Sequence, residues 1–242
     1  MGEITRLFFQ TIAASFTRPF YLSRVFEQIN VLGVGSISIT IVIGLTMGSV
    51  MTLNFGYGLM KFGGTMYVPA VVSLSLAREM APLFTSLLIA GRIGSGMAAE
   101  IGSMNVTQQV DAIRALGTSP VRVLVVPRFW ASVISLPLLS AISFIVGIFG
   151  GLVVCLHEFD MPTGFYMHKV TYTVQMADYL GGLIKSAIFG GIIAIIGCYK
   201  GLKTRDGTRG VGLSTTWVVV TSSITILITN FFISKLFIVF WG

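Results

Sequence analysis

The chain has 242 residues, of which 54% are hydrophobic and 10% charged, and its mean hydropathy is +0.89. Soluble domains carry roughly 25% charged residues, so this composition excludes an ordinary soluble protein and indicates an all-α integral membrane protein. The length accommodates about five or six spans of ~20 residues and leaves no room for a separate soluble domain, which predicts a single domain over residues 1–242. The formal charge of +7 is assigned to topology and anionic lipid headgroups, and nucleic acid is excluded as a partner.

The first 24 residues are predicted to form a helix that lies in the membrane interface. Their apolar residues recur at intervals of three and four, with polar residues between them: Ile4, Leu7, Phe8, Ile12, Phe16 and Phe20. An amphipathic helix of this kind buries one face at the level of the headgroups. The early Glu3 and the lack of a small-residue cleavage site argue against a cleaved signal peptide.

Apolar runs with few or no charges predict five transmembrane helices. They lie at residues 30–54, from Pro69 past Gly91, at 129–156, at 179–199 and at 210–234. Each run is long enough to cross a hydrocarbon core, which takes about 20 helical residues. Lys185 lies near one end of the fourth span, where its amine is expected to snorkel to the headgroups.

The distribution of lysine and arginine predicts the orientation. With a cytoplasmic N-terminus, the outside loops carry Lys61 and Lys169, and the inside segments carry ten basic residues: Arg6, Arg18, Arg24, Arg114, Arg122, Arg128, Lys200, Lys203, Arg205 and Arg209. Cytoplasmic loops are enriched in these residues. We therefore predict a cytoplasmic N-terminus and a C-terminus on the opposite, periplasmic side.

A short helix is predicted between spans two and three, at residues 105–117. Asn105 is its expected N-cap, and Gln108 follows three residues later in a capping-box arrangement. Gly117 suits the C′ position, and Pro120 prevents continuation. A dozen helical residues reach roughly 18 Å against a hydrocarbon core of about 30 Å, so this helix cannot span the membrane. We interpret it as a cytoplasmic element for binding another protein.

Span two carries the charged residues Arg78, Glu79 and Arg92. An ionisable group at this depth costs roughly 2.5 to 3.5 kcal/mol on insertion scales and normally faces a cavity or a partner. One hypothesis is that these side chains line a polar route or headgroup site for an amphipathic substrate; the other is an Arg–Glu pair that satisfies itself inside the bundle. Pro82 is expected to kink the helix and free backbone carbonyl groups.

Small residues mark the expected helix contacts. They form GxxxG pairs and stripes in spans one to four: Gly44 and Gly48, Gly147 and Gly151, Gly197 and Gly201, and in span two Ala90, Gly94, Ala98 and Gly102 beside Gly91, Ser95, Ala99 and Ser103. Such surfaces allow close approach of two backbones. They favour packing within the chain and leave open a contact between two copies.

Enzymatic motifs are absent from the spans. The glycine-rich run 91–96 lacks the Lys-Ser/Thr of a nucleotide-binding loop. His157 and His168 lie in a predicted outer loop at a spacing that matches no standard metal site. No serine has a histidine in the membrane to activate it. We therefore predict a non-catalytic protein without a metal site, whose energy comes from elsewhere.

Two blocks of sequence resemble the MlaE type of ABC transporter permease. The first block contains the runs 78–83, 90–94, 98–104, 108–113, 117–120 and 126–129, and the second the runs 185–201, 207–212 and 219–231. Together they cover nearly all of the chain. It departs from the family's usual pattern at Gln108, where Glu is usual, and at Asn230, where Asp is common.

The resemblance implies a permease that moves phospholipids between the inner membrane of a Gram-negative bacterium, or an equivalent envelope membrane, and periplasmic or outer-membrane carriers, maintaining outer-membrane lipid asymmetry. It implies a homodimer with an ATPase subunit that binds ATP and Mg²⁺, an MCE-domain periplasmic protein and, in many cases, a STAS-domain subunit. The lipid-pathway candidates are then Arg78, Glu79 and Arg92. The short helix would dock in the ATPase through Asn105, Gln108, Gln109, Asp111, Ile113 and Arg114.

Two other classes of function stay open at this point. A secondary transporter of an amphipathic solute would use an ion gradient, although five spans and a docking helix argue against one. An intramembrane lipid-modifying enzyme would need a nucleophile and base or a metal set within a span, and the sequence offers none.

Overall fold

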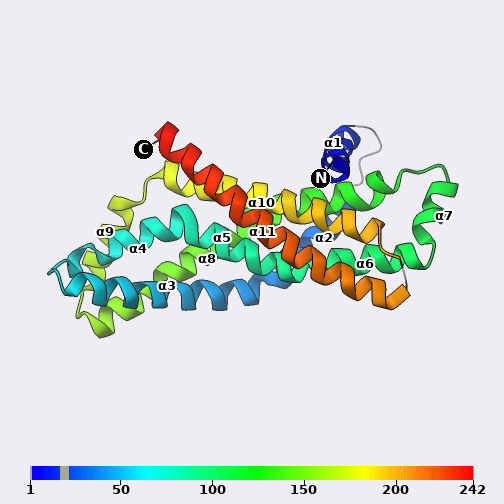
Figure 1. Cartoon of the computed structure of the whole chain (residues 1–242). Helices are drawn as coiled ribbons and strands as arrows, with labels where there is room; N and C mark the ends of the chain where they lie inside the picture. Colours follow the sequence, from blue (N-terminus) through cyan, green and yellow to red (C-terminus); the bar gives the residue numbers. More distant parts are fainter. Residues whose placement is uncertain (1, 17–21, 206, 242) are drawn as a thin grey trace. The chain divides into compact units, whose positions relative to one another are not determined.

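The computed structural model describes residues 2–16, 22–205 and 207–241, which are mostly helical and contain no strand. The helices are α1 (Gly2–Ser15), α2 (Leu22–Leu32), α3 (Ile37–Met60), α4 (Val68–Ser75), α5 (Ala81–Ile89), α6 (Ser95–Val106), α7 (Gln109–Ala115), α8 (Val126–Glu158), α9 (Thr163–Thr173), α10 (Met176–Leu202) and α11 (Gly207–Trp241) (Figure 1). Arg18 and Phe20, two residues named above, lie outside the described ranges.

Five helical segments of the described chain are long and apolar enough to cross a membrane. They are Leu22–Met60, Thr65–Val106, Val121–Glu158, Met176–Leu202 and Gly207–Phe237. The all-α architecture with five spans is therefore confirmed. Each segment extends past the predicted span, because the prediction stopped at charged residues and the helices continue beyond them.

The chain divides into two compact units. Unit 1 comprises Met1–Gly35, Ser86–Leu136 and Ala187–Phe232, and unit 2 comprises Ser36–Thr85, Pro137–Ser186 and Ile233–Gly242. The helices α5, α8, α10 and α11 contribute residues to both units. The expectation of a single membrane domain stays a prediction.

Three short π-helical turns interrupt the long helices, and each contains one arginine. They are η3 (Leu76–Met80) with Arg78, η4 (Ala90–Gly94) with Arg92 and η5 (Val121–Val125) with Arg122. A π turn adds one residue to a helical turn and is frequently found at functional sites. The two intramembrane arginines singled out from the sequence therefore lie at local distortions of span two.

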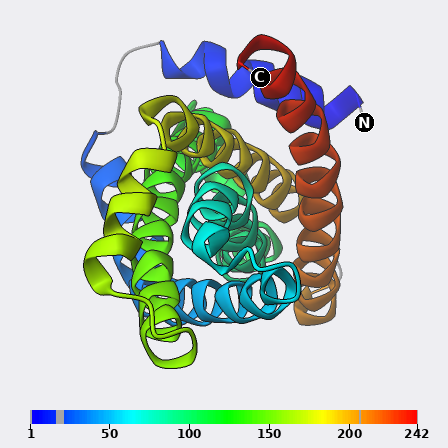
Figure 2. The same cartoon turned by 90° about the vertical axis from the view of Figure 1, so that its left-hand side faces the viewer.

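The core of unit 2 is built around α4. Its buried residues come from α4, η3, α8 and α9 and include Val68, Val72, Leu76, Ile148, Cys155, Tyr166 and Val170. The hydroxyl of Tyr166 donates to the carbonyl oxygen of Ile148 at 3.0 Å, which satisfies the one polar atom of this buried ring. Figure 2 shows α4 (cyan) with α3 (blue) and α9 (yellow-green) packed around it.

Glycines bring α3 and α8 close together within unit 2. A Cβ added to Gly44 would lie 2.7 Å from the carbonyl oxygen of Ser143, and one added to Gly48 would overlap Gly147. The opposite helix places Gly151 against Thr52 and Tyr166 in the same manner. The predicted GxxxG pairs of spans one and three are thus confirmed as packing surfaces, and the pairing occurs inside one chain.

Small residues make a similar contact in unit 1. Ala90, Gly94, Ala98 and Gly102 form a buried stripe. A Cβ on Gly197 would lie 3.1 Å from the carbonyl oxygen of Gly94, and one on Gly201 would lie 2.8 Å from Ile101. The neighbouring stripe, of Gly91, Ser95, Ala99 and Ser103, is partly exposed. Span two therefore uses one of its two smooth faces against α10.

An ion pair of one buried and one exposed side chain stabilises the same unit. The guanidinium of Arg128 is 5% exposed, and its Nη2 lies 2.6 Å from Oε1 of Glu100. Its Nη1 also donates to the carbonyl oxygen of Leu124 at 2.9 Å. A buried charge requires such partners, because desolvation of an unpaired ion costs several kcal/mol.

The N-terminal amphipathic helix is shorter than predicted. It ends at Ser15, and the next helix begins at Leu22, so a single helix over residues 1–24 is wrong. At its end, Ser15 Oγ donates to the carbonyl of Thr11, and the N–H of Phe16 bonds only three residues back, to Ala13. These bonds tighten the last turn, a common way for a helix to end.

Hydrogen bonds attach α1 to the rest of unit 1. The indole of Trp130 donates to Ser15 Oγ at 3.0 Å. At the other end, the Glu3 carboxylate accepts hydrogen bonds from Tyr199, at 2.7 Å, and from Lys203. The bond from Lys203, followed by that from Tyr199, lowers the pKa of Glu3, and the Glu3 carboxylate in turn raises the pKa of Lys203.

Candidate functional site

A cavity of about 340 Å³ in unit 2 contains the charged residues of span two. Arg78 and Glu79 line it from η3, together with Asp178 and Lys185 of α10 and Ser234 of α11. Apolar and small residues complete the lining: Leu74, Ala177, Gly181, Gly182 and Phe237. Ligand sites commonly combine an apolar wall with a few fixed polar groups, and this cavity has both.

Arg78 forms an ion pair with the start of α10. Its Nε lies 2.6 Å from Oδ1 of Asp178, with Arg78 half exposed and Asp178 10% exposed. The other oxygen of Asp178 accepts the backbone N–H of Gln175 at 3.1 Å. Gln175 precedes the first residue of α10, so Asp178 caps this helix from its first turn. The capping bond fixes the carboxylate that holds Arg78.

Glu79 pairs with Lys185. The distance from Lys185 Nζ to Glu79 Oε1 is 2.6 Å, and the lysine is 3% exposed. The amine also donates to Ser234 Oγ at 2.9 Å and to the carbonyl oxygen of Arg78 at 3.0 Å. The hydroxyl of Ser234 donates in turn to Glu79 Oε1 at 2.8 Å. All three donors of the ammonium group are therefore used.

This geometry corrects the expectation for Lys185. We predicted that its amine would snorkel to the headgroups, and that is wrong, because the side chain is buried against Glu79. A buried ammonium is tolerated where an anion and further acceptors surround it. The ion pairs of Arg78 and Glu79 are made with α10, to Asp178 and Lys185 respectively, and differ from the Arg–Glu pair considered above.

Pro82 lies beside this network. It has no N–H to donate to the carbonyl of Arg78, four residues earlier, and the π turn η3 precedes it. Lys185 donates to that carbonyl instead. The close approach of α10 depends on Gly182, since a Cβ there would overlap the carbonyl oxygen of Ala77. Pro82 thus leaves the carbonyl of Arg78 free, as expected, and this carbonyl accepts its hydrogen bond from a side chain of α10.

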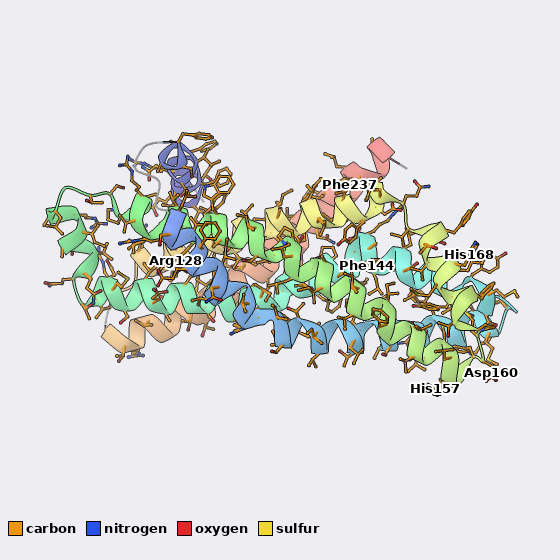
Figure 3. The ribbon with its side chains drawn as sticks, turned by 180° about the vertical axis from the view of Figure 1, so that it is seen from behind. Arg128, Phe144, His157, Asp160, His168 and Phe237 are labelled. Atoms are coloured by element: carbon orange, nitrogen blue, oxygen red, sulfur yellow. The ribbon has the colours of Figure 1, made fainter. Side chains whose placement is uncertain are left out.

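Phe237 closes one side of the cavity. It lies beside the first turns of α10 (Figure 3), where a Cβ added to Gly181 would be 3.4 Å from its ring. The ring centroid is 5.8 Å from Lys185 Nζ, a cation–π distance. The cavity thus places an aromatic surface next to the two ion pairs.

Arg92 occupies a different environment. It belongs to η4 in unit 1, and its Nη1 donates to the carbonyl oxygen of Gly35. A Cβ added to Gly35 would lie 3.1 Å from Arg92 Nη2, so the absence of a side chain there admits the guanidinium. The structure brings Arg78 and Glu79 together in one cavity, whose lining does not include Arg92.

Several residues of the cavity were missed from the sequence. Asp178, Lys185, Ser234 and Gln175 line it, and none was predicted as a site residue. A signal existed for Lys185, because a lone cation within a span needs an anion, and Glu79 was available in another span. Ser234 gave no signal, since serines occur throughout the spans.

The short helix α7 differs from its prediction at the N-terminal end. Asn105 lies within α6, and its Nδ2 donates to the carbonyl oxygen of Thr204 at 2.9 Å, so its assignment as N-cap is wrong. Gln108 precedes α7 in the left-handed conformation, with φ of 59°, and makes no capping bond with its side chain. The capping box is therefore wrong, and the helix contains 7 residues, from Gln109 to Ala115.

The C-terminal end of α7 agrees with its prediction. Gly117 has φ of +74°, and its N–H bonds to the carbonyl of Arg114, while Thr118 bonds to Ile113. This pair of bonds is the Schellman motif, which favours glycine at C′. Pro120 then precedes η5, where the chain enters span three.

The surface of α7 is open. Val110 is fully buried and Ile113 partly buried, while Gln108, Gln109, Asp111 and Arg114 are exposed. Asp111 Oδ1 accepts a bond from Arg114 Nη1 at 2.8 Å within the helix. One buried valine thus anchors a helix whose other side chains remain available to a partner.

The two histidines lie on helices, where a loop was predicted. His157 lies in the last turn of α8, and His168 lies on α9, where its ring stacks on Tyr172. Figure 3 shows both histidines and Asp160 at the end of unit 2 that holds α9. Within the described ranges, no group of three or more His, Cys, Asp or Glu residues is placed to hold a metal ion.

Comparison with known proteins identifies the family. The family model described as permease MlaE matches residues 25–236. This chain belongs to the MlaE permease family. The MlaE match covers α7, nearly all of the five spans and every lining residue of the cavity except Phe237, so the resemblance expected from the sequence is confirmed.

Two of three proteins similar to this MlaE-family chain are named as probable ABC transporter permeases. A probable ABC transporter permease of Rickettsia felis is 37% identical over 237 residues, which are 98% of this chain and 92% of that protein. One from Synechocystis is 44% identical over 210 residues, 87% of this chain and 80% of the other. The chloroplastic protein TRIGALACTOSYLDIACYLGLYCEROL 1 of Arabidopsis thaliana is 33% identical over 211 residues, 87% of this chain and 60% of that protein.

Membership of the family establishes the general role. The chain is a permease subunit of an ABC transporter and a multi-pass membrane protein. An ABC permease works with an ATPase subunit, so this chain has one as a partner.

Proposed function

We propose that this chain is the permease of an ATP-driven phospholipid transporter. The observation that carries the proposal is the cavity of unit 2, where the ion pairs Arg78–Asp178 and Glu79–Lys185 lie against Phe237 and Leu74. A phospholipid has the same combination of charged headgroup and apolar chains. The half-exposed Arg78 is the group that would meet a phosphate, since guanidinium binds phosphate through two parallel hydrogen bonds.

The comparisons support a lipid substrate indirectly. The name of the Arabidopsis relative contains trigalactosyldiacylglycerol, which is a glycerolipid. That name describes another protein, but its 33% identity over 87% of this chain makes a glycerolipid the first substrate to test.

The assembly and location follow from the same proposal. The permease would form a homodimer in the inner membrane of a Gram-negative bacterium, with its N-terminus in the cytoplasm and its C-terminus in the periplasm. A separate ATPase subunit would bind ATP and Mg²⁺ and grip α7. An MCE-domain protein would exchange phospholipid on the periplasmic side, and a STAS-domain subunit would accompany the ATPase. The excess of arginine and lysine in the connections next to α1, α7 and the end of α10 supports this orientation.

Reconstitution tests the proposed function directly. The permease and its ATPase would be placed in liposomes with a fluorescent phospholipid, and lipid transfer to an acceptor would be followed with ATP, without ATP and with an ion gradient alone. Transfer that requires ATP hydrolysis supports the proposal. Transfer driven by the ion gradient alone would instead identify a secondary transporter, and a chemically altered lipid would identify a modifying enzyme.

A further inference from the structure

A polar groove lies beside α7 in unit 1. It has a volume of about 470 Å³ and is lined by residues of α6, α7, the end of α10 and the connection from α10 to α11: Asn105, Asp111, Arg114, Leu202, Lys203 and Arg205. Figure 1 shows this connection next to α7 and the end of α6. Three of the lining side chains are cationic and one is anionic. We call this region the basic groove.

Hydrogen bonds hold the two sides of the basic groove together. Asn105 at the end of α6 donates to the carbonyl oxygen of Thr204, and the hydroxyl of Thr204 donates to Ser214 Oγ of α11 at 2.9 Å. Thr204 is 3% exposed, and a Cβ added to Gly102 would lie 3.0 Å from its hydroxyl oxygen. The connection therefore keeps one position against α6, and a preformed surface loses less conformational entropy on binding.

The counter-ions around the groove are exchangeable. Asp111 pairs with Arg114, and Glu3 of α1 pairs with Lys203. Every side chain of these two pairs is about half exposed or more, and exposed ion pairs contribute little. Arg205, which is also exposed, adds a third cation. A carboxylate arriving from outside can therefore be accepted without breaking a buried interaction.

Resting on the proposed function, we propose that the basic groove receives a carboxylate-bearing segment of the ATPase subunit. The ATPase would then contact the permease at two points, α7 and the connection that carries Lys203 and Arg205. The three cations of the lining complement a carboxylate, and the groove shares Asp111 and Arg114 with α7, the element proposed to dock in the ATPase.

An anionic membrane surface fits the groove less well. Asp111 lies in the lining, where it would repel headgroup phosphates, and it makes the groove a mixture of charges typical of a protein interface. The neighbouring surface of α7 is polar as well, with Gln109, Asp111 and Arg114 exposed. A helix that binds a membrane surface presents an apolar face to it instead.

The arrangement has a mechanical consequence. A movement of the ATPase would reach α6 through α7, and α10 and α11 through their connection, at the same time. The hydrogen bond from Asn105 to Thr204 links the end of α6 to the connection between α10 and α11. The groove would thus couple the movement of three spans, to which α6, α10 and α11 belong.

The test measures binding of the purified ATPase to the full-length permease in phosphatidylcholine nanodiscs. We would compare wild type with Arg205→Glu and with the double variant Arg205→Glu/Lys203→Gln. Arg209→Glu is the matched control, because it makes the same change of charge on an exposed residue outside the groove. Glu3→Gln is the second control, since it removes the partner of Lys203 and keeps its charge.

We expect Arg205→Glu to weaken binding about fivefold or more at low salt, mainly by slower association, and to flatten the dependence of affinity on salt. Arg209→Glu and Glu3→Gln should bind within about twofold of wild type. Wild-type affinity and salt dependence in the double variant would overturn the inference, as would an equal loss in Arg209→Glu.

Two further outcomes separate the possibilities. If the loss in Arg205→Glu occurs only in discs that contain phosphatidylglycerol, the occupant of the groove is the membrane and the inference is wrong. If the wild-type permease binds the ATPase and moves lipid while every variant binds equally well, the proposed function stands and the inference alone fails. A wild-type permease that binds no ATPase refutes both.

Discussion

Lys185 donates a hydrogen bond from Nζ to the backbone carbonyl oxygen of Arg78, at a distance of 3.0 Å. This is the carbonyl that Pro82, four residues later, has no N–H to reach. The same amine neutralises the carboxylate of Glu79. One buried side chain of α10 therefore satisfies both the irregular backbone and the partly buried carboxylate of span two.

The first prediction concerns this pair. Lys185→Met leaves the carboxylate of Glu79 without its cation, and we expect a loss of about 2 to 4 kcal/mol in the free energy of unfolding, since breaking a buried pair is strongly destabilising. The figure lies below that for a fully buried pair because Glu79 is about one third exposed. Unfolding of the purified protein in mixed micelles measures it.

A double variant shows whether the lost stability comes from the ion pair or from disruption of the packing. In Lys185→Met/Glu79→Gln both charges are gone, so at least half of the lost stability should return. If the double variant is as unstable as the sum of the two single variants, the ion pair does not account for the buried lysine.

Arg78 and Asp178 allow a test of substrate contact. Exchanging the two residues, as Arg78→Asp/Asp178→Arg, can rebuild the ion pair with its polarity reversed. We expect Arg78→Ala to reduce ATP-driven lipid transfer about tenfold, the value of one lost charged interaction of 1.4 kcal/mol. The exchanged variant should be more stable than Arg78→Ala because its ion pair is rebuilt. Its lipid transfer should remain slow, because the guanidinium then projects from α10. Full recovery of transfer would make Arg78 a structural residue.

The docking of α7 predicts a separation of binding from folding. Asp111→Lys and Ile113→Asp should abolish co-purification of the ATPase while the permease keeps its melting temperature, since Asp111 is exposed and Ile113 only partly buried. Val110→Asp is the informative contrast, because Val110 is fully buried and a carboxylate there should destabilise the fold. Undiminished ATPase binding by both surface variants would exclude α7 as the docking element.

Local features of the fold could be predicted from the sequence. The five spans follow from apolar runs with few or no charges, because hydrophobic length largely decides which helices can cross a membrane. Gly117 was placed correctly, because a helix C-terminus is fixed by backbone conformation within a few residues. The glycine pairs of spans one and three were recognised as contact surfaces from their four-residue spacing. The sequence could not show that these two pairs contact each other.

Features that depend on distant residues could not be predicted. Asn105 was assigned as an N-cap by a local rule, yet its partner is the carbonyl of Thr204, 99 residues away. Lys185 was expected at the headgroups because its anion, Glu79, lies 106 residues earlier. In both cases a contact with a distant residue decides the role of the polar side chain, although its local sequence favours a different role.

The attachment of α1 predicts a dependence on pH. The pKa of Glu3 is lowered from 4.5 by its hydrogen bonds with Lys203 and Tyr199, so its contribution is complete above about pH 4.5 and is lost as the pH falls through the lower folded value. The pKa of Lys203 is raised from 10.5, so its contribution is complete below about pH 10.5 and is lost as the pH rises further. The attachment of α1 should therefore hold between about pH 4.5 and pH 10.5. Starting from pH 7, a smaller change of pH is needed to weaken it with acid than with base.

Tryptophan fluorescence can follow this release. Trp130 donates to Ser15 at the other end of α1, so a protein with Trp217→Phe and Trp241→Phe reports α1 through Trp130 alone. We expect its emission to shift to longer wavelength below about pH 4.5, where Glu3 takes up a proton. In Glu3→Gln the emission should already be shifted at pH 7 and respond little to acid. An acid transition of the same size and midpoint in Glu3→Gln would show that another group controls the attachment of α1.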